Sequence, residues 1–131
     1  MKILVVDDEK DIKVLFEQRF RKEIRSNEIE FVFAYSAEEA IFYLEKHLHE
    51  AVLILSDINM PGMSGLELLS YIKNKHAMPP PVVMMITAYG DEDNYKQAIH
   101  LGADEFITKP LDFSLLKEKL KKQFDDKNIG S

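Results

Sequence analysis

The fold is decided by residues 52–66, which read VLILSDINMPGMSGL. The stretch begins as a run of branched apolar residues, typical of a strand buried on both faces, and the run stops at Asp57, shortly before Pro61 and Gly62. Ser64 is placed to cap a following helix. Ligands bind at the carboxyl ends of strands in an open α/β sheet, so Asp57 stands where chemistry occurs. Because a single Asp at this place more often bonds a turn, the inference depends on the other strand ends.

The rest of the chain alternates between strand and helix patterns. Strands are predicted at 2–6, 29–34, 51–56, 82–86 and 104–108. Helices are predicted at 11–23, 36–47, from 64 to before 78, at 91–101 and at 112–124. Five strands alternating with five helices require a parallel sheet with right-handed crossovers. The first, third and fourth strands are the most apolar, which predicts a doubly wound sheet in the order 2-1-3-4-5.

The composition is that of one ordinary globular domain, with 131 residues, 46% of them hydrophobic and 31% charged. We expect the domain to span residues 1–125, with 126–131 as a flexible tail. The chain has no Cys, which excludes disulfides and thiolate chemistry, and no signal-peptide pattern, which together favour a cytoplasmic location. A net charge of −6 argues against direct nucleic-acid binding, and no apolar run approaches the roughly 20 residues of a membrane span.

Polar side chains follow four of the five predicted strands. Asp7 and Asp8 end the first strand, Asp57 the third, Thr87 the fourth and Lys109 the fifth. All should meet at one edge of a parallel sheet, where three crowded carboxylates require a cation or a raised pKa. Oxygen ligands without His or Cys favour Mg²⁺, with Mn²⁺ as a substitute. A carboxylate surrounded by a metal, an ammonium and a hydroxyl suits phosphoryl transfer.

These motifs together resemble the receiver domain of response regulators, and most of all the stand-alone type of bacterial chemotaxis. The resemblance covers residues 2 to about 124. Its motifs are Asp7-Asp8, Asp57-x-x-Met60-Pro61-Gly62, Thr87-Ala88 and Lys109-Pro110. It implies a flavodoxin-like α/β fold. It also implies a phosphoacceptor signalling domain of a two-component phosphorelay rather than an enzyme. Such a domain catalyses only its own phosphotransfer and autodephosphorylation.

The resemblance also implies a role for each residue of the metal and phosphoryl site. Asp57 would accept a phosphoryl group from a phosphohistidine. Asp8 and Asp57 would ligate Mg²⁺ together with the backbone carbonyl of Asn59, while Asp7 would act mainly through a metal-bound water. Thr87 and Lys109 would bind the phosphoryl oxygens.

Four residues around this site have further implied roles. Phe106 occupies the position of the aromatic switch that responds to Thr87. The bond before Pro110 is expected to be cis. Asn59 and Tyr89 each lie two residues past a site residue, so we expect this pair to tune hydrolysis of the phosphoryl group. Alternatively, Tyr89 points to solvent or packs at a dimer face.

The implied partners are a sensor histidine kinase or a phosphotransfer protein, and a downstream effector protein or domain. Phosphorylation would change the face made by the 91–101 helix, the last strand and the last helix, and phosphorylation-dependent dimerisation is a further expectation. No membrane or nucleic-acid partner is expected.

Three other functional classes compete with this one. A haloacid-dehalogenase-type phosphatase requires a second Asp where Asn59 stands. An EF-hand requires oxygen ligands where Pro61 and Leu68 stand. A receiver-like module that binds partners without phosphorylation remains open as the alternative.

Overall fold

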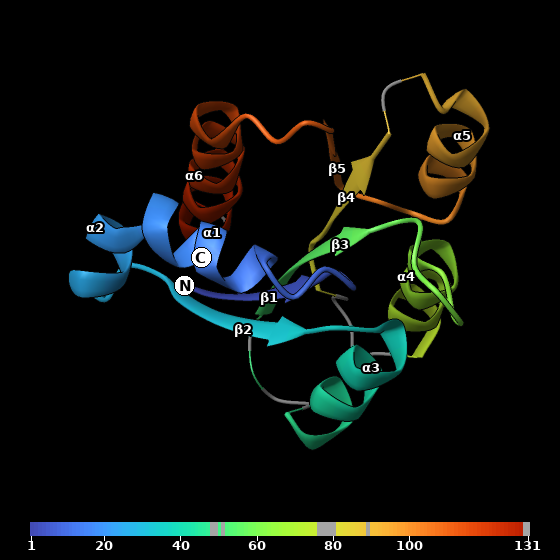
Figure 1. Cartoon of the computed structure of the whole chain (residues 1–131), viewed down its shortest axis with the longest axis horizontal. Helices are drawn as coiled ribbons and strands as arrows, with labels where there is room; N and C mark the ends of the chain where they lie inside the picture. Colours follow the sequence, from blue (N-terminus) through green and yellow to red (C-terminus); the bar gives the residue numbers. More distant parts are fainter. Residues whose placement is uncertain (48–49, 51, 76–80, 89, 130–131) are drawn as a thin grey trace.

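A central parallel β-sheet organises the molecule, and helices cover both of its faces (Figure 1). The computed structural model describes residues 1–47, 50, 52–75, 81–88 and 90–129, and of residues 52 and 124–129 the backbone alone. The strand order is β2-β1-β3-β4-β5, which confirms the predicted topology. The strands are β1 (Lys2–Val6), β2 (Glu30–Ala34), β3 (Val52–Asp57), β4 (Val83–Thr87) and β5 (Glu105–Thr108).

The helices divide between the two faces of the sheet. They are α1 (Ile12–Arg19), α2 (Arg21–Arg25), α3 (Ala37–Lys46), α4 (Gly65–Lys75), α5 (Glu92–His100) and α6 (Phe113–Ile129). Buried residues of α3, α4 and α5 form one hydrophobic core with the sheet, and those of α1 and α6 form the other. Within the described residues, no helix has the length and apolar character that crossing a bilayer requires.

Alternate side chains along each strand contribute to the hydrophobic cores on the two faces of the sheet. Leu4 and Val6 of β1 pack toward α3 and α4, whereas Ile3 and Val5 pack toward α1 and α6. All four are fully buried, because side chains on a strand point alternately to opposite faces and both faces are covered. The inner strands therefore consist of continuous apolar runs, and this rigid sheet holds the strand ends in place.

The prediction of one helix over residues 11–23 is wrong, because the chain forms two helices separated at Phe20. That residue has φ −110° and ψ 22°, and its ring is fully buried. Its ring centre lies 5.7 Å from that of Phe16 and 5.0 Å from that of Phe31. Aromatic packing in the core therefore overrides the local helix pattern, and the described residues form six helices instead of the five predicted.

Polar caps fix the starts of α3 and α6. The Oγ of Ser36 accepts a hydrogen bond from the Glu39 N–H (3.0 Å), and Asp112 Oδ1 accepts one from the Leu115 N–H (3.1 Å). The backbone of α6 continues to Ile129, beyond the predicted domain boundary at 125. Residues 125–129 contain neither Pro nor Gly, so nothing in this segment breaks the helix.

Candidate functional site

The strand register brings Asp7 and Asp57 together. Val6 of β1 pairs with Ser56 of β3, so Asp7 and Asp57 lie side by side just past this pair. Both carboxylates are buried, with 3% and 4% of each residue exposed, whereas Asp8 is exposed. The sequence predicted this convergence, since parallel strands end at the same edge of the sheet.

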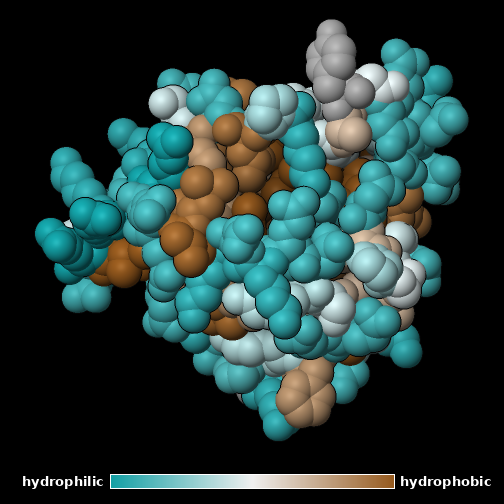
Figure 2. All heavy atoms as spheres, in the orientation of Figure 1, coloured by the Kyte–Doolittle hydropathy of each residue, from teal (hydrophilic) through white to brown (hydrophobic). Residues whose placement is uncertain are grey.

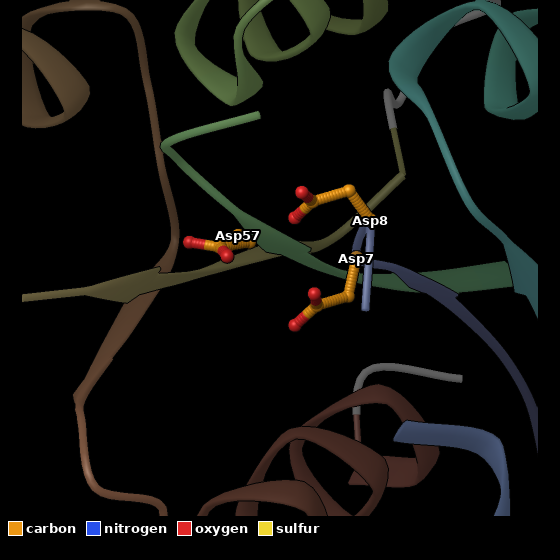
Figure 3. A group of neighbouring side chains, drawn as sticks. All are labelled: Asp7, Asp8 and Asp57. Atoms are coloured by element: carbon orange, nitrogen blue, oxygen red, sulfur yellow. The ribbon is translucent and has the colours of Figure 1, made fainter. Parts of the chain in front are cut away.

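Asp7, Asp8 and Asp57 form one cluster of carboxylates. One oxygen from each residue lies within 4.8 Å of the other two. Figure 3 shows the three side chains extending from the ends of β1 and β3 toward the same side. Carboxylates this close repel one another unless a cation lies between them or one is protonated.

Lys109 brings one positive charge to this cluster. Its Nζ lies 2.9 Å from Asp57 Oδ2. Burial lowers the pKa of Lys109, but the hydrogen bond and charge of Asp57, with the further charge of Asp7, outweigh burial and raise that pKa above its ordinary value. The ammonium group therefore stays protonated at neutral pH, and one cation faces three carboxylates.

The pKa of Asp7 is raised above its ordinary value. Burial is the largest cause, and the charge of Asp57 adds to it. Two groups act in the opposite direction: the Glu9 N–H, which donates to Asp7 Oδ1 at 2.9 Å, and Lys109. The Asp7 carboxylate is thus the buried negative charge that most lacks a compensating cation.

The loop after Asp57 is held close to the end of β3. The N–H of Gly65 donates to the carbonyl oxygen of Ile58 (2.8 Å), and the hydroxyl of Ser56 donates to the carbonyl oxygen of Asp57 (2.9 Å). A side chain at position 65 has no room, because a Cβ there would lie 2.0 Å from the Asp57 carbonyl oxygen. Sequence reasoning missed these two supports. The signals in the sequence were the small size of Ser56, directly before Asp57, and that of Gly65, at the start of the following helix.

Thr87 and Lys109 are joined through the backbone of neighbouring strands. Thr87 is buried at the end of β4, and it follows Ile86, the register partner of Asp57. Thr87 pairs with Thr108 of β5, and its carbonyl oxygen accepts a hydrogen bond from the Lys109 N–H (2.9 Å). The ends of β3, β4 and β5 therefore bring a carboxylate, a hydroxyl and an ammonium group to one edge of the sheet.

The remaining predicted residues lie around this edge. Phe106 is partly buried on β5, and its ring centre is 4.5 Å from that of Tyr95 on α5. Asn59 is exposed in the loop after β3, and the Lys109–Pro110 peptide bond is cis. Tyr89 lies outside the described residues.

The donor set fits a divalent metal of the Mg²⁺ class. The cluster offers carboxylate oxygens without imidazole or thiolate, as a hard cation prefers. Asp8 leaves part of the cluster open to solvent, which suits an ion that keeps several of its waters.

Comparisons with known proteins agree with this geometry. The family model described as the response regulator receiver domain matches residues 3–121. The response regulator protein PilR of Pseudomonas aeruginosa is 40% identical over 120 residues, which are 89% of this chain and 24% of that protein. A cyclic di-GMP phosphodiesterase of Thermotoga maritima is 37% identical over 121 residues, 92% of this chain and 30% of that protein.

A solved structure shows the same likeness over nearly the whole chain. The crystal structure of a response regulator receiver domain protein from Clostridium thermocellum has a TM-score of 0.84 and 27% identity, covering 99% of this chain and 98% of that one. The chain spans only 24% of the length of PilR and 30% of that of the Thermotoga maritima protein. With the sheet order, the residues at the strand ends and these matches in agreement, the chain belongs to the response regulator receiver domain family.

Proposed function

We propose that Asp57 accepts a phosphoryl group from the phosphohistidine of a sensor histidine kinase or a phosphotransfer protein. One observation carries this proposal: a buried carboxylate at a strand end contacts the Lys109 ammonium at 2.9 Å and lies within 4.8 Å of two further carboxylates. The sheet fixes all of these groups, and phosphoryl transfer depends mainly on such positioning and charge neutralisation.

The transfer step exchanges one bond to phosphorus for another. An oxygen of Asp57 attacks the phosphorus, the P–O bond forms, the P–N bond breaks, and the electron pair returns to the imidazole nitrogen of the donor. Lys109 then faces a phosphoryl oxygen in place of a free carboxylate, and Thr87 donates its hydroxyl hydrogen to another.

Asp8, Asp57 and the backbone carbonyl of Asn59 would hold Mg²⁺, with Mn²⁺ as a substitute, and Asp7 would bind through a metal-bound water. When bound, the ion supplies positive charge that offsets the carboxylates and the incoming phosphoryl group. The two carboxylates beside Asp57, which otherwise repel the donor, become part of its binding site.

The output would pass through Thr87 and Phe106. As the Thr87 hydroxyl moves toward the phosphoryl group, Phe106 would fill the vacated space and change the face formed by α5, β5 and α6. A downstream effector protein or domain, or a second copy of the chain, would read that face. Asn59 and Tyr89 would set how fast water reaches the phosphorus, and autodephosphorylation would return the domain to its resting state.

The test is incorporation of a phosphoryl group from acetyl phosphate in the presence of Mg²⁺. We expect a hydroxylamine-sensitive phosphoryl group on Asp57, located by mass spectrometry of the intact chain and its peptides. Asp57→Asn should incorporate none. Asp93→Asn, at an exposed position of α5, is the matched control and should behave as wild type. Absence of phosphate from wild-type Asp57 would favour the alternative, a receiver-like module that binds partners without phosphorylation.

A further inference from the structure

A basic surface lies around α2, far from the carboxylate cluster. Residues 19–25 carry Arg19, Arg21, Lys22 and Arg25 against one carboxylate, Glu23, and all four cations are exposed. Within the described part of the chain, no carboxylate lies within 4.0 Å of Arg21, Lys22 or Arg25. In a chain of net charge −6, this is a local concentration of uncompensated positive charge.

These cations surround a shallow depression that is widely open to solvent. An open depression of ≈ 590 Å³ is lined by the four basic residues together with Glu23 and Lys117 of α6, among others. Figure 1 shows α2 at the edge of the molecule beside the amino ends of β1 and β2, away from the carboxyl ends that hold the phosphoacceptor site. We call this depression the α2 basic hollow.

A second cavity adjoins the α2 basic hollow. It has a volume of ≈ 440 Å³, and Phe20, Ile29 and Leu120 line it together with Met1, Glu28 and Lys121. Of the first three, Ile29 is partly exposed, whereas Phe20 and Leu120 are buried. Glu23 and Lys117 line both depressions, and the Lys117 Nζ lies 3.2 Å from Glu23 Oε2. The ion pair therefore forms the wall between a basic depression and a cavity lined by both apolar and charged residues. Figure 2 shows hydrophilic side chains over the outer side of α2, with apolar side chains emerging beside them.

One carboxylate oxygen of this ion pair lacks a hydrogen-bond donor among the described residues. Glu23 Oε1 is enclosed, and no donor in the described part of the structure lies within hydrogen-bond distance of it. An enclosed acceptor without a donor costs stability. An entering chain that separates the ion pair, and so uncovers Glu23 Oε1, would offer a carboxylate to Lys117 and a backbone N–H to Glu23.

From these observations we infer that the α2 basic hollow and the adjoining cavity bind an acidic peptide segment of a partner protein. Its carboxylates lie on Arg21, Lys22 and Arg25, and one apolar side chain enters the cavity beside the partly exposed Ile29. Carboxylate and guanidinium groups pair well, and a recessed, partly apolar pocket suits a single anchoring side chain.

The same features argue against two other polyanions. Nucleic acid bound without sequence preference relies on exposed aromatic rings or long basic stripes, but Phe20 is fully buried and the basic residues of the hollow are confined to residues 19–25 and Lys117. A lipid surface requires apolar side chains that project outward among the cations, whereas Phe20 and Leu120 beside these cations are buried. The acidic peptide is therefore the ligand class that the surface favours.

The test measures fluorescence anisotropy of a labelled peptide in which Glu residues flank one Leu, titrated with the full chain. Arg21→Glu/Arg25→Glu should weaken binding by about tenfold or more, since close charge pairs become repulsive. Lys75→Glu/Lys96→Glu, which reverses two exposed lysines on α4 and α5, changes the net charge equally and should weaken binding by less than about threefold. Thermal melts of both double variants verify that they are folded.

Three results would overturn the inference. Equal loss of binding in the two double variants would mean that net charge alone attracts the peptide. A peptide with Ser in place of Leu that binds as tightly would mean that the adjoining cavity is not used. Tighter binding of a labelled single-stranded RNA, or of phosphatidylserine vesicles, that depends on Arg21 and Arg25 would assign the surface to another class of ligand.

Discussion

Gly65 lies so close to the end of β3 that a Cβ at this position would be 2.0 Å from the carbonyl oxygen of Asp57. The same Cβ would lie 2.8 Å from the Ile58 Cα, so the contact involves backbone that cannot rotate away. The first residue of α4 and the proposed phosphoacceptor are therefore fixed relative to one another by direct backbone contact.

Gly65→Ala should consequently destabilise the domain by about 3 kcal/mol or more, measured as a lower urea midpoint. Gly90→Ala is the matched control. Gly90 has φ +86°, but a Cβ at this position would have nothing within 4 Å, so backbone strain alone acts and the cost should be about 1 kcal/mol. Similar losses in the two variants would contradict the close-contact account.

Replacing Asp7 by Asn should stabilise the domain in the absence of Mg²⁺. The pKa of Asp7 in the folded state is above its ordinary value of 3.8, so ionised Asp7 opposes folding. The cost is absent below pH 3.8, grows as the pH rises through the folded pKa, and is complete above that pKa. An Asn side chain keeps an oxygen that accepts from the Glu9 N–H but lacks the charge. Asp7→Asn should therefore raise the free energy of unfolding by about 1 kcal/mol at pH 7.

The accompanying measurement is the rise in melting temperature on adding Mg²⁺. Wild type should gain the most, and Asp7→Asn should gain less because it loses a ligand group. Asp8→Asn is the comparison. Because Asp8 is exposed, the melting temperature of this variant without Mg²⁺ should stay near that of wild type. An unchanged Mg²⁺ response in both variants would show that the cluster is not the metal site.

The sheet could be predicted from the sequence because each of its rules is local. Apolar runs mark buried strands, a polar residue marks where four of the five runs stop, and parallel strands bring those ends together. Asp7 and Asp57 meet because Val6 and Ser56 are in register, and the apolar content of the strands predicted that β1 and β3 are neighbours.

The features that the sequence did not reveal depend on contacts between distant residues. The helix boundary at Phe20 follows from its packing on Phe31, which is remote in sequence, while the local pattern continues through it. The requirement for Gly65 arises from a loop that folds back on Asp57, and a glycine at a helix start has several common explanations. Such contacts override propensity and have no periodic signal.

Glu105 should make the free energy of unfolding depend on pH at acidic pH values. Burial raises its pKa, but the Phe106 N–H and the Lys119 ammonium, each 2.9 Å from Glu105 Oε1, outweigh burial and lower that pKa below its ordinary value of 4.5. A lowered folded pKa contributes stability that is present above pH 4.5 and lost as the pH falls through the folded pKa.

Glu105→Gln should therefore be less stable than wild type at pH 7, by about 0.5–1 kcal/mol for this partly exposed ion pair of β5 with α6. The difference should shrink as the pH falls below 4.5, which urea unfolding at several pH values measures. Glu118→Gln removes a carboxylate from an exposed position of α6 and serves as the control. A deficit of constant size across this range would mean that the carboxylate charge is not responsible.

The last prediction concerns how the site reaches α5. In the part of α5 described, Ala98 is the one fully buried residue, and Tyr95 and Ile99 are 43% and 51% exposed. The helix is therefore held to the sheet by few contacts, among them the ring of Tyr95 on that of Phe106 at 4.5 Å. A weakly held element is the one that a small change at a neighbouring site can most readily move.

Beryllofluoride with Mg²⁺, which mimics a phosphoryl group on Asp57, should thus shift amide resonances in α5 and β5 as well as in the loops around Asp57. Phe106→Ala should retain the shifts near Asp57 and lose those in α5, because the ring that links the two is gone. Phe42→Ala, at a 62% exposed position on α3, is the matched control and should keep both sets. Wild-type shifts confined to the loops, or α5 shifts that persist in Phe106→Ala, would show that Phe106 does not couple the phosphoacceptor site to α5.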